Sequence, residues 1–181
     1  MSTRGVAISC WLLSAVYALT VAGAQTTVPQ SKGTTLAGTA IALPDALKGK
    51  VGILIVGFSH ASQNQVTPWV RLLQADYGKS TYVAYFALPM LGGAPKILRG
   101  MIEKSMGKAV PFEERQHFLP ITEGEPAWRA VAHYDKPDNA YVLLVDGTGT
   151  IRWQMTGGAT DMAYAELKKN LRVVIAQVFF P

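Results

Sequence analysis

The sequence predicts an α/β domain built on a central mixed sheet. Two observations favour this fold class. Continuous runs of β-branched and apolar residues are typical of strands that are covered on both faces. These runs alternate with segments in which apolar residues recur at helical spacing. The predicted order is a βαβ unit, a helical insertion, a β-hairpin and a final helix, and the length of 181 residues corresponds to one domain plus an extra segment.

The extra segment lies at the amino terminus and has the composition of a secretory signal peptide. Between Met1 and Ala24 the only charged side chain is Arg4, and a long apolar stretch ends in the small residues Ala22-Gly23-Ala24. We expect cleavage after residue 24 and a periplasmic or secreted protein. A mitochondrial transit peptide would be richer in arginine. An uncleaved anchor remains the alternative, because the apolar run is only slightly shorter than the about 20 residues of a spanning helix.

Removal of residues 1–24 would leave a chain without cysteine, because Cys10 is the single cysteine of the sequence. Thiol–disulfide exchange needs an attacking thiolate and a resolving thiol. We therefore expect neither thiol oxidoreductase nor peroxidase activity. The formal net charge of +5 would fall to +4 with the loss of Arg4. Since the basic residues are spread along the chain, we expect no nucleic-acid partner.

The domain itself is expected at residues 36–181, after a polar, turn-rich tether at residues 25–35. Its first element is the apolar run Val51–Phe58, which predicts a buried strand followed by a polar loop. The turn Asp146-Gly147-Thr148-Gly149 predicts a hairpin and no phosphate cradle, because no helix follows it. The other predicted elements are helices at 66–77, 94–110 and 125–134, strands at 81–88, 140–145 and 151–155, and a last helix at 161–177 capped by Thr160 or Asp161.

Two of these regions resemble the thioredoxin-like superfamily, and the resemblance runs from about Leu36 to Val178. The tetrapeptide Ser62-Gln63-Asn64-Gln65 stands where thioredoxins carry their Cys-x-x-Cys pair. The strand and turn from Tyr141 to Ile151 are similar to paired strands in exported thioredoxin-like and peroxiredoxin-like proteins. Those proteins usually place a cis-proline just before that strand, where this chain has Asn139-Ala140, with Pro137 slightly too early. The resemblance implies a thioredoxin-like fold with a degenerate redox loop.

Further stretches resemble one non-redox branch of this superfamily, the mitochondrial ATP synthase assembly factors that act on subunit a. These stretches are Leu98–Lys104, Tyr141–Asp146, Ile151-Arg152-Trp153 and Gly158-Ala159-Thr160. The resemblance implies a protein that binds a client or assists its assembly into a membrane complex. The predicted export segment favours a bacterial relative with a different client.

Four residues are predicted to bind this partner, namely Arg99, Gly100, Arg152 and Trp153. On an alternating strand, Trp153 and Arg152 point to opposite faces. Arginine beside an exposed aromatic residue is typical of interfaces. The alternative, a core Trp153 and a structural ion pair of Arg152, stays open.

Other chemistry has less support. Ser59 or Ser62 beside His60 would begin a hydrolytic site, but no carboxylate lies nearby in the sequence to orient the imidazole, so a capped loop entering a helix is favoured. The scattered His60, His117 and His133 predict no metal site, and we expect no cofactor. The alternatives left open are a thiol-independent enzyme and an accessory to an envelope redox system. We expect the methionines to fill the core: Met90, Met101, Met106, Met155 and Met162.

Overall fold

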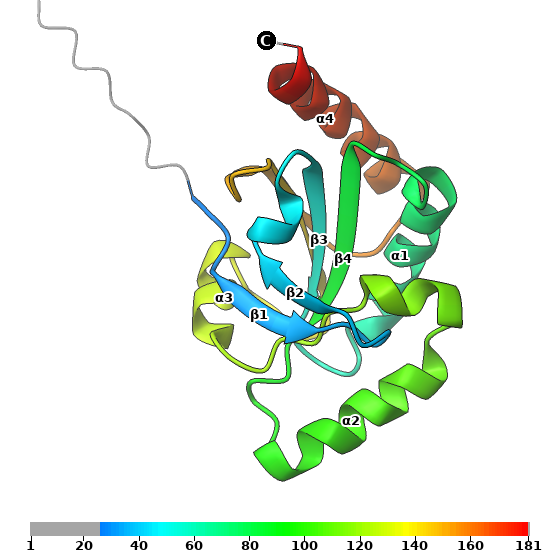
Figure 1. Ribbon diagram of the computed structural model, residues 1–181, viewed down its shortest axis with the longest axis vertical. Coiled ribbons are helices and arrows are strands. Elements are labelled where there is room, and N and C mark those ends of the chain that lie inside the picture. The colour runs from blue at the N-terminus through cyan, green and yellow to red at the C-terminus, as the bar shows by residue number, and fades with distance from the viewer. Residues whose placement is uncertain (1–25, 181) are drawn as a thin grey trace, which may run out of the picture.

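The computed structural model describes residues 26–180, so the predicted signal peptide and Cys10 lie outside the described residues. A four-stranded mixed sheet with the strand order β4-β3-β5-β6 lies at the centre of the molecule (Figure 1). This architecture confirms the predicted α/β class. Among the described residues, no helix has both the length and the apolar character needed to cross a membrane.

The two central strands of the sheet, β3 and β5, are buried because they are apolar on both sides. Strand β3 (Val51–Gly57) lies in the interior, parallel to β4 (Val83–Pro89) and antiparallel to β5 (Ala140–Val145), which pairs with the antiparallel β6 (Ile151–Thr156). Every residue of β3 and β5 is buried. Continuous apolar runs are therefore explained by layers that cover both faces of the sheet.

One face of the sheet is covered by α1 (Gln63–Tyr77) and α4 (Asp161–Phe179), whose buried residues pack with alternate side chains of β3. The opposite face is covered by a two-stranded sheet, the short 3-10 helix η1 (Asp45–Leu47) and α3 (Glu125–Val131). Figure 1 shows the two-stranded sheet crossing in front of β3 and β4. Each layer has its own core cluster, and the fully buried Trp69 and Trp128 are the largest members of the two.

The predicted tether at residues 25–35 is wrong for its described part. Strand β1 (Ser31–Thr34) pairs antiparallel with β2 (Ala40–Leu43), and the side chain of Val28 is buried. Trp128 Nε1 donates a hydrogen bond to Ser31 Oγ at 2.9 Å. A short strand that exposes every second side chain carries many polar residues, so its composition resembles that of a loop.

The helices largely follow the predicted pattern. α2 (Lys96–Ala109) lies within its predicted range, and Thr160 Oγ1 accepts a hydrogen bond from Ala163 N at 3.2 Å, as expected for a cap of α4. The segment between α2 and α3 contains a 3-10 helix, η2 (Phe112–His117), that the sequence did not predict. After η2 the chain runs parallel to β4 and pairs with it at Phe118 and Ile121, which covers this edge of the sheet.

Candidate functional site

The segment Ser59–Gln65, which is a loop up to Ser62 and the first turn of α1 from Gln63, lies at the carboxyl end of β3, where the end of β4 and the start of β5 also lie. Ser62 is completely buried directly before α1. A Cβ atom added at Gly57 would come within 2.5 Å of Ser62 Oγ, so the buried serine depends on the glycine of the strand. The loop is thus packed into the fold at the position of the predicted degenerate redox motif.

Two serines fasten this loop to the first turn of α1. Ser62 N donates to Ser59 Oγ at 3.0 Å, and Ser62 Oγ donates to the Ser59 carbonyl oxygen at 2.7 Å. These bonds satisfy groups that a helix start leaves unpaired. α1 begins at Gln63, three residues earlier than the apolar spacing indicated, and the side chain of its N-cap residue Ser62 makes no capping hydrogen bond to the helix. The loop is instead held by the two bonds between Ser59 and Ser62.

The last residue of the tetrapeptide ties the loop to β5. Gln65 Oε1 accepts a hydrogen bond from Ala140 N at 3.1 Å, whereas Asn64 is exposed. A proline at the start of β5 would have no N–H group to satisfy. Ala140 has one, and Gln65 supplies the acceptor. The cis peptide bond of the described chain lies elsewhere, between Leu43 and Pro44.

The fold brings a carboxylate to Ser59 that the sequence did not reveal. Ser59 Oγ donates to Asp138 Oδ1 at 2.9 Å, although the two residues are 79 positions apart. His60 is exposed, and no hydrogen bond joins its imidazole to either serine among the described residues. Asp138 thus binds the hydroxyl and does not orient an imidazole, as a nucleophile–base–acid triad requires.

The three histidines lie in separate environments. His133 Nδ1 lies 2.6 Å from Gln154 Nε2, and the His117 ring stacks on Tyr85 with 3.9 Å between the ring centroids. Within residues 26–180, no three histidine or acidic side chains come together in a way that could hold a metal ion.

A cluster of aromatic and charged residues borders the loop on the β5 side, and the sequence analysis did not identify it. The Phe58 ring contacts Tyr134 and Tyr141 edge to face, with centroids 5.0 and 5.5 Å apart. The Arg129 guanidinium lies 3.9 Å from the Tyr134 centroid and pairs with Glu125 at 2.7 Å. The spacing of four residues between Glu125 and Arg129 on one helix was the available sequence signal.

The buried Tyr141 orders the segment that carries Asp138. Its hydroxyl accepts hydrogen bonds from Asp135 N at 3.0 Å and from Lys136 N at 2.9 Å, and it lies 2.5 Å from Asp135 Oδ1. Burial, followed by the bond to Asp135, raises the pKa of Tyr141 above its usual value. The hydrogen bond from Tyr141 lowers the pKa of Asp135. The raised pKa of Tyr141 keeps its hydroxyl neutral, and the lowered pKa of Asp135 keeps its carboxyl ionised. We conclude that the hydrogen bonds between them serve to position this segment.

The predicted partner-binding residues divide between two regions. Arg99 donates from Nε to Ala94 O at 3.1 Å and from Nη2 to Gly92 O at 3.0 Å, and Gly100 is exposed. Arg152 pairs with Asp146 at 2.7 Å, and the half-buried Trp153 packs against the core cluster beneath α1 and α4. The ion pair and the packing that were left open as an alternative are therefore present.

Arg99 and Arg152 do not form one surface. Arg99 lies in α2, which follows the carboxyl end of β4, whereas Arg152 lies near the start of β6 at the opposite edge of the sheet. Since β6 runs antiparallel to β5, its start lies at the opposite end of the sheet from the carboxyl ends of β3 and β4. Their roles in binding a partner stay predictions for two separate regions.

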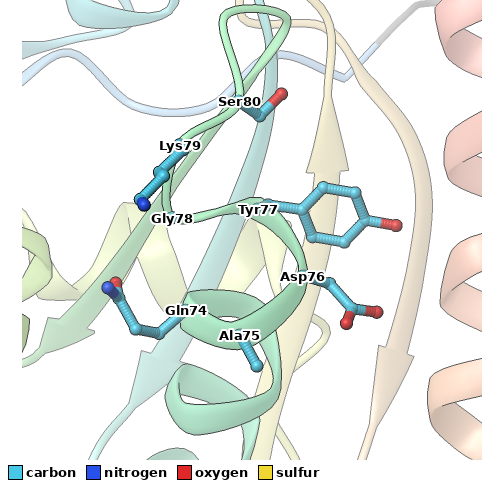
Figure 2. Close-up of a pocket in the computed structure, with 7 residues that line it drawn as sticks. All are labelled: Gln74, Ala75, Asp76, Tyr77, Gly78, Lys79 and Ser80. Atoms are coloured by element: carbon cyan, nitrogen blue, oxygen red, sulfur yellow. The ribbon is translucent and has the colours of Figure 1, made fainter.

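A hollow in the surface lies at the other end of α1 from the loop and is lined by residues 74–80 (Figure 2). Gln74 and Lys79 point to one side in this view, while Asp76 and Tyr77 point to the other. The polar side chains do not converge on a common point, so the hollow lacks the arrangement typical of a ligand site.

The expectation that the methionines fill the core is wrong for most of them. Met90 is buried, whereas Met106 and Met155 are only half-buried. Met101 in α2 and Met162 in α4 are exposed. Helical spacing alone did not reveal that one apolar side of α2 lies away from the body of the protein.

Glu114 of η2 is a buried acid outside the loop region. The residue is 7% exposed, and within the described part of the chain its Oε2 atom has no hydrogen-bond partner. Burial raises the pKa of this carboxyl, Arg71 of α1 lowers it, and the neighbouring Glu113 raises it. The net effect is a pKa above the usual value, so the ionised carboxylate is less favourable in the folded protein than in the unfolded chain.

We expect Glu114→Gln to increase the free energy of unfolding at pH 7 by about 1 kcal/mol, because it removes a buried charge that lacks a partner. A group whose pKa is higher in the folded protein than in the unfolded chain stabilises the fold fully at any pH below its pKa in the unfolded chain. This stabilisation is lost as the pH rises through its pKa in the folded protein. The difference in the free energy of unfolding between Glu114→Gln and the wild type should therefore shrink as the pH falls toward 4. Urea unfolding between pH 4 and pH 7 measures this difference. The exposed Glu113→Gln is the matched control, and an equal effect of both variants would contradict the assignment.

No protein-family model matches this chain, and no curated protein sequence matches it. Solved structures do match its fold. An exposed lipoprotein thioredoxin from Streptococcus pneumoniae is 14% identical, with a TM-score of 0.57 over 79% of this chain and 100% of that one. StoA from Bacillus subtilis is 16% identical, with a TM-score of 0.54 over 79% of this chain and 99% of that one.

The thioredoxin domain of a thiol-disulfide oxidoreductase from Bacteroides vulgatus is 15% identical, with a TM-score of 0.53 over 81% of this chain and 96% of that one. These similarities confirm the predicted thioredoxin-like fold. At such low identity they establish the fold alone.

Proposed function

We propose that this thioredoxin-like chain is an exported, non-catalytic domain that binds a protein client and assists its assembly into a membrane complex. The observation that carries the proposal is the state of the tetrapeptide Ser62-Gln63-Asn64-Gln65. The resemblance to the superfamily equates these residues with its cysteine pair, and two of them, Ser62 and Gln65, are used to hold the fold together. The short resemblance to the ATP synthase assembly factors supports the client role.

The chemistry of the loop argues against redox activity of the domain. A serine hydroxyl does not undergo thiol–disulfide exchange, and Ser62 is buried and hydrogen-bonded to Ser59. Residues 25–181 contain no cysteine that could act in its place. A thiol-independent hydrolase would need a base at Ser59, but the exposed His60 is not bonded to it. Binding is therefore the function that these residues support best.

The open edge of β6 is the surface that we assign to the client. The edge of β4 is covered by the segment that pairs at Phe118 and Ile121. On β6, the described chain makes an outer backbone bond only near its start, from Ile151 N to Thr26 O. Residues 152–156 thus present unpaired backbone groups to which an extended client segment can add a strand. Two of the four predicted partner-binding residues, Arg152 and Trp153, lie on this strand.

Site-specific cross-linking in the native cell tests this proposal. A photoreactive amino acid at the exposed Thr156 of β6 is expected to yield a cross-link to one membrane-complex subunit, and the same group at the exposed Glu166 of α4 serves as the control. Arg152→Ala should lower the cross-linked yield several-fold. Equal cross-linking from both positions, or none from Thr156, would show that β6 does not hold the client.

A further inference from the structure

Helix α2 is attached to the domain without contributing to its core. None of its residues is buried, and within residues 26–180 neither core cluster nor the half-buried residues packed against them include a residue of α2. Figure 1 shows the helix lying apart from the sheet, beyond the ends of β3 and β4. Arg99 holds its first turn to the preceding loop through the carbonyl groups of Gly92 and Ala94. The helix is therefore positioned by its connections, while one side faces away from the protein.

The outward side of α2 is apolar. Ile97 is 89% exposed, Met101 is 68% exposed and Leu98 is 41% exposed. Their spacings of three and four residues place them together on one side of the helix. The half-buried residues lie on the other side: Arg99, Ile102, Glu103, Met106 and Gly107. An exposed apolar stripe on a helix that the core does not use indicates a contact with something outside the chain.

The charged residues on the outward side are all basic. Lys96, Lys104 and Lys108 are exposed; Lys104 and Lys108 continue the line of Ile97 and Met101 along the helix, and Lys96 is its first residue. The single acid of the helix, Glu103, is half-buried on the inner side. The exposed surface of α2 thus has an apolar stripe in its first half, lysines beyond it in the second half, one lysine at the helix start and no exposed carboxylate.

We propose that α2 lies in the headgroup region of an anionic lipid bilayer, with Ile97, Leu98 and Met101 inserted and the lysines contacting acidic headgroups. A basic amphipathic helix with an aliphatic stripe is the form typical of interfacial helices, and lysine stems can extend from the apolar layer to the charged one. Protein hot spots instead favour tryptophan, tyrosine and arginine, and the one arginine of α2 is occupied by backbone carbonyls. This role goes beyond client binding, since it positions the domain on a membrane.

A fluorescent label that reports local polarity tests the inference on the full chain, independently of any membrane contact of the amino-terminal segment. In a Cys10→Ser background, an environment-sensitive dye is attached at Ser105→Cys on the outward side of α2. A second protein carries the same dye at Ala165→Cys, an exposed position of α4. Each is mixed with vesicles of phosphatidylcholine alone or of phosphatidylcholine with phosphatidylglycerol, whose anionic headgroups attract basic segments.

We expect a blue shift of the dye at position 105 with the anionic vesicles and no comparable shift at position 165. Lys104→Gln with Lys108→Gln should weaken the response on the order of tenfold, whereas Lys79→Gln with Lys169→Gln should leave it unchanged. Ile97→Ser with Met101→Ser should abolish it, while the exposed pair Met162→Ser with Val173→Ser on α4 should not.

Equal shifts at both positions, or equal shifts with neutral and anionic vesicles, would overturn the proposal. A dye at position 105 that stays in water on vesicles but becomes shielded on addition of a purified client would assign α2 to a protein instead. Circular dichroism of each variant confirms that it is folded before the comparison.

Discussion

Replacing Trp128 with alanine is expected to lower the free energy of unfolding by about 3–5 kcal/mol, the range for removing a large aromatic side chain from a packed core. Trp128 is completely buried in the cluster that joins α3 to the two-stranded sheet. Its indole also donates the hydrogen bond to Ser31 Oγ, so its loss leaves that part of β1 without its anchor. Chemical denaturation followed by circular dichroism measures the change.

The hydrogen bond can be separated from the packing. Ser31→Ala removes the acceptor and keeps the tryptophan, and it should cost about 1 kcal/mol. Trp153→Ala is a size-matched control at a half-buried position and should cost less than Trp128→Ala. A loss below 1 kcal/mol for Trp128→Ala, with no effect of Ser31→Ala, would mean that residues 31–34 do not pack on the domain.

The second large effect is expected from Asp146→Ala, which should lower the free energy of unfolding by about 2–4 kcal/mol at pH 7. The carboxylate is buried in the β5–β6 turn, where Oδ1 accepts from Thr148 N at 2.9 Å and from Thr150 N at 3.1 Å. Oδ2 pairs with Arg152 at 2.7 Å. Removing Asp146 leaves these donors without an acceptor, and the buried Thr150 N cannot reach water instead, which costs about 1–3 kcal/mol for an unsatisfied buried group.

The effect of Asp146 should depend on pH. Burial acts to raise the pKa of this carboxyl, but the hydrogen bonds from Thr148, Thr150 and Arg152 outweigh burial, and the net pKa is below the usual value. Because the pKa of Asp146 is lower in the folded protein than its value of 3.8 in the unfolded chain, its carboxylate stabilises the fold above pH 3.8. This stabilisation is lost as the pH falls through the pKa of Asp146 in the folded protein. The difference in the free energy of unfolding between the wild type and Asp146→Ala should therefore close below pH 4.

Unfolding curves at pH 7, 5 and 3 test this dependence. The exposed Asp138→Ala serves as the control, because it removes one surface hydrogen bond to Ser59 and should change stability by less than 1 kcal/mol at any of these values. A gap that stays constant down to pH 3 would show that the charge of Asp146 does not stabilise the turn.

The sheet illustrates what could be predicted locally. The predicted strand at 140–145 has the bounds of β5, and the predicted hairpin joins β5 to β6. Both could be predicted because an apolar run bounded by turn residues is recognisable from a few neighbouring residues. The cap of α4 at Thr160 could be predicted for the same reason, because its hydrogen bond joins residues three positions apart. The thioredoxin-like fold was predicted through resemblance to short motifs, and the solved structures confirm it.

The loop region illustrates what could not be predicted. The bonds from Ser59 to Asp138 and from Ala140 to Gln65 join segments that are more than 70 residues apart. The burial of β1 against Trp128 is similarly a contact between distant parts of the chain. No periodicity or propensity encodes such pairs, because they depend on how the layers pack. A polar side chain of this kind occurs equally in a tether and in an active site, so its residue type does not reveal which contact it makes.

The sequence by itself determined the apolar strands, the order of the strands and α-helices from β3 onward and the absence of a cysteine from residues 25–181, since these are properties of residue type and spacing. Only the tertiary structure decided that the degenerate loop is tied into the fold and that the two predicted partner-binding arginines lie in separate regions. The tertiary structure also left one apolar side of α2 exposed, because the core is already filled by other elements. Whether an apolar helical stripe is buried depends on what packs against it.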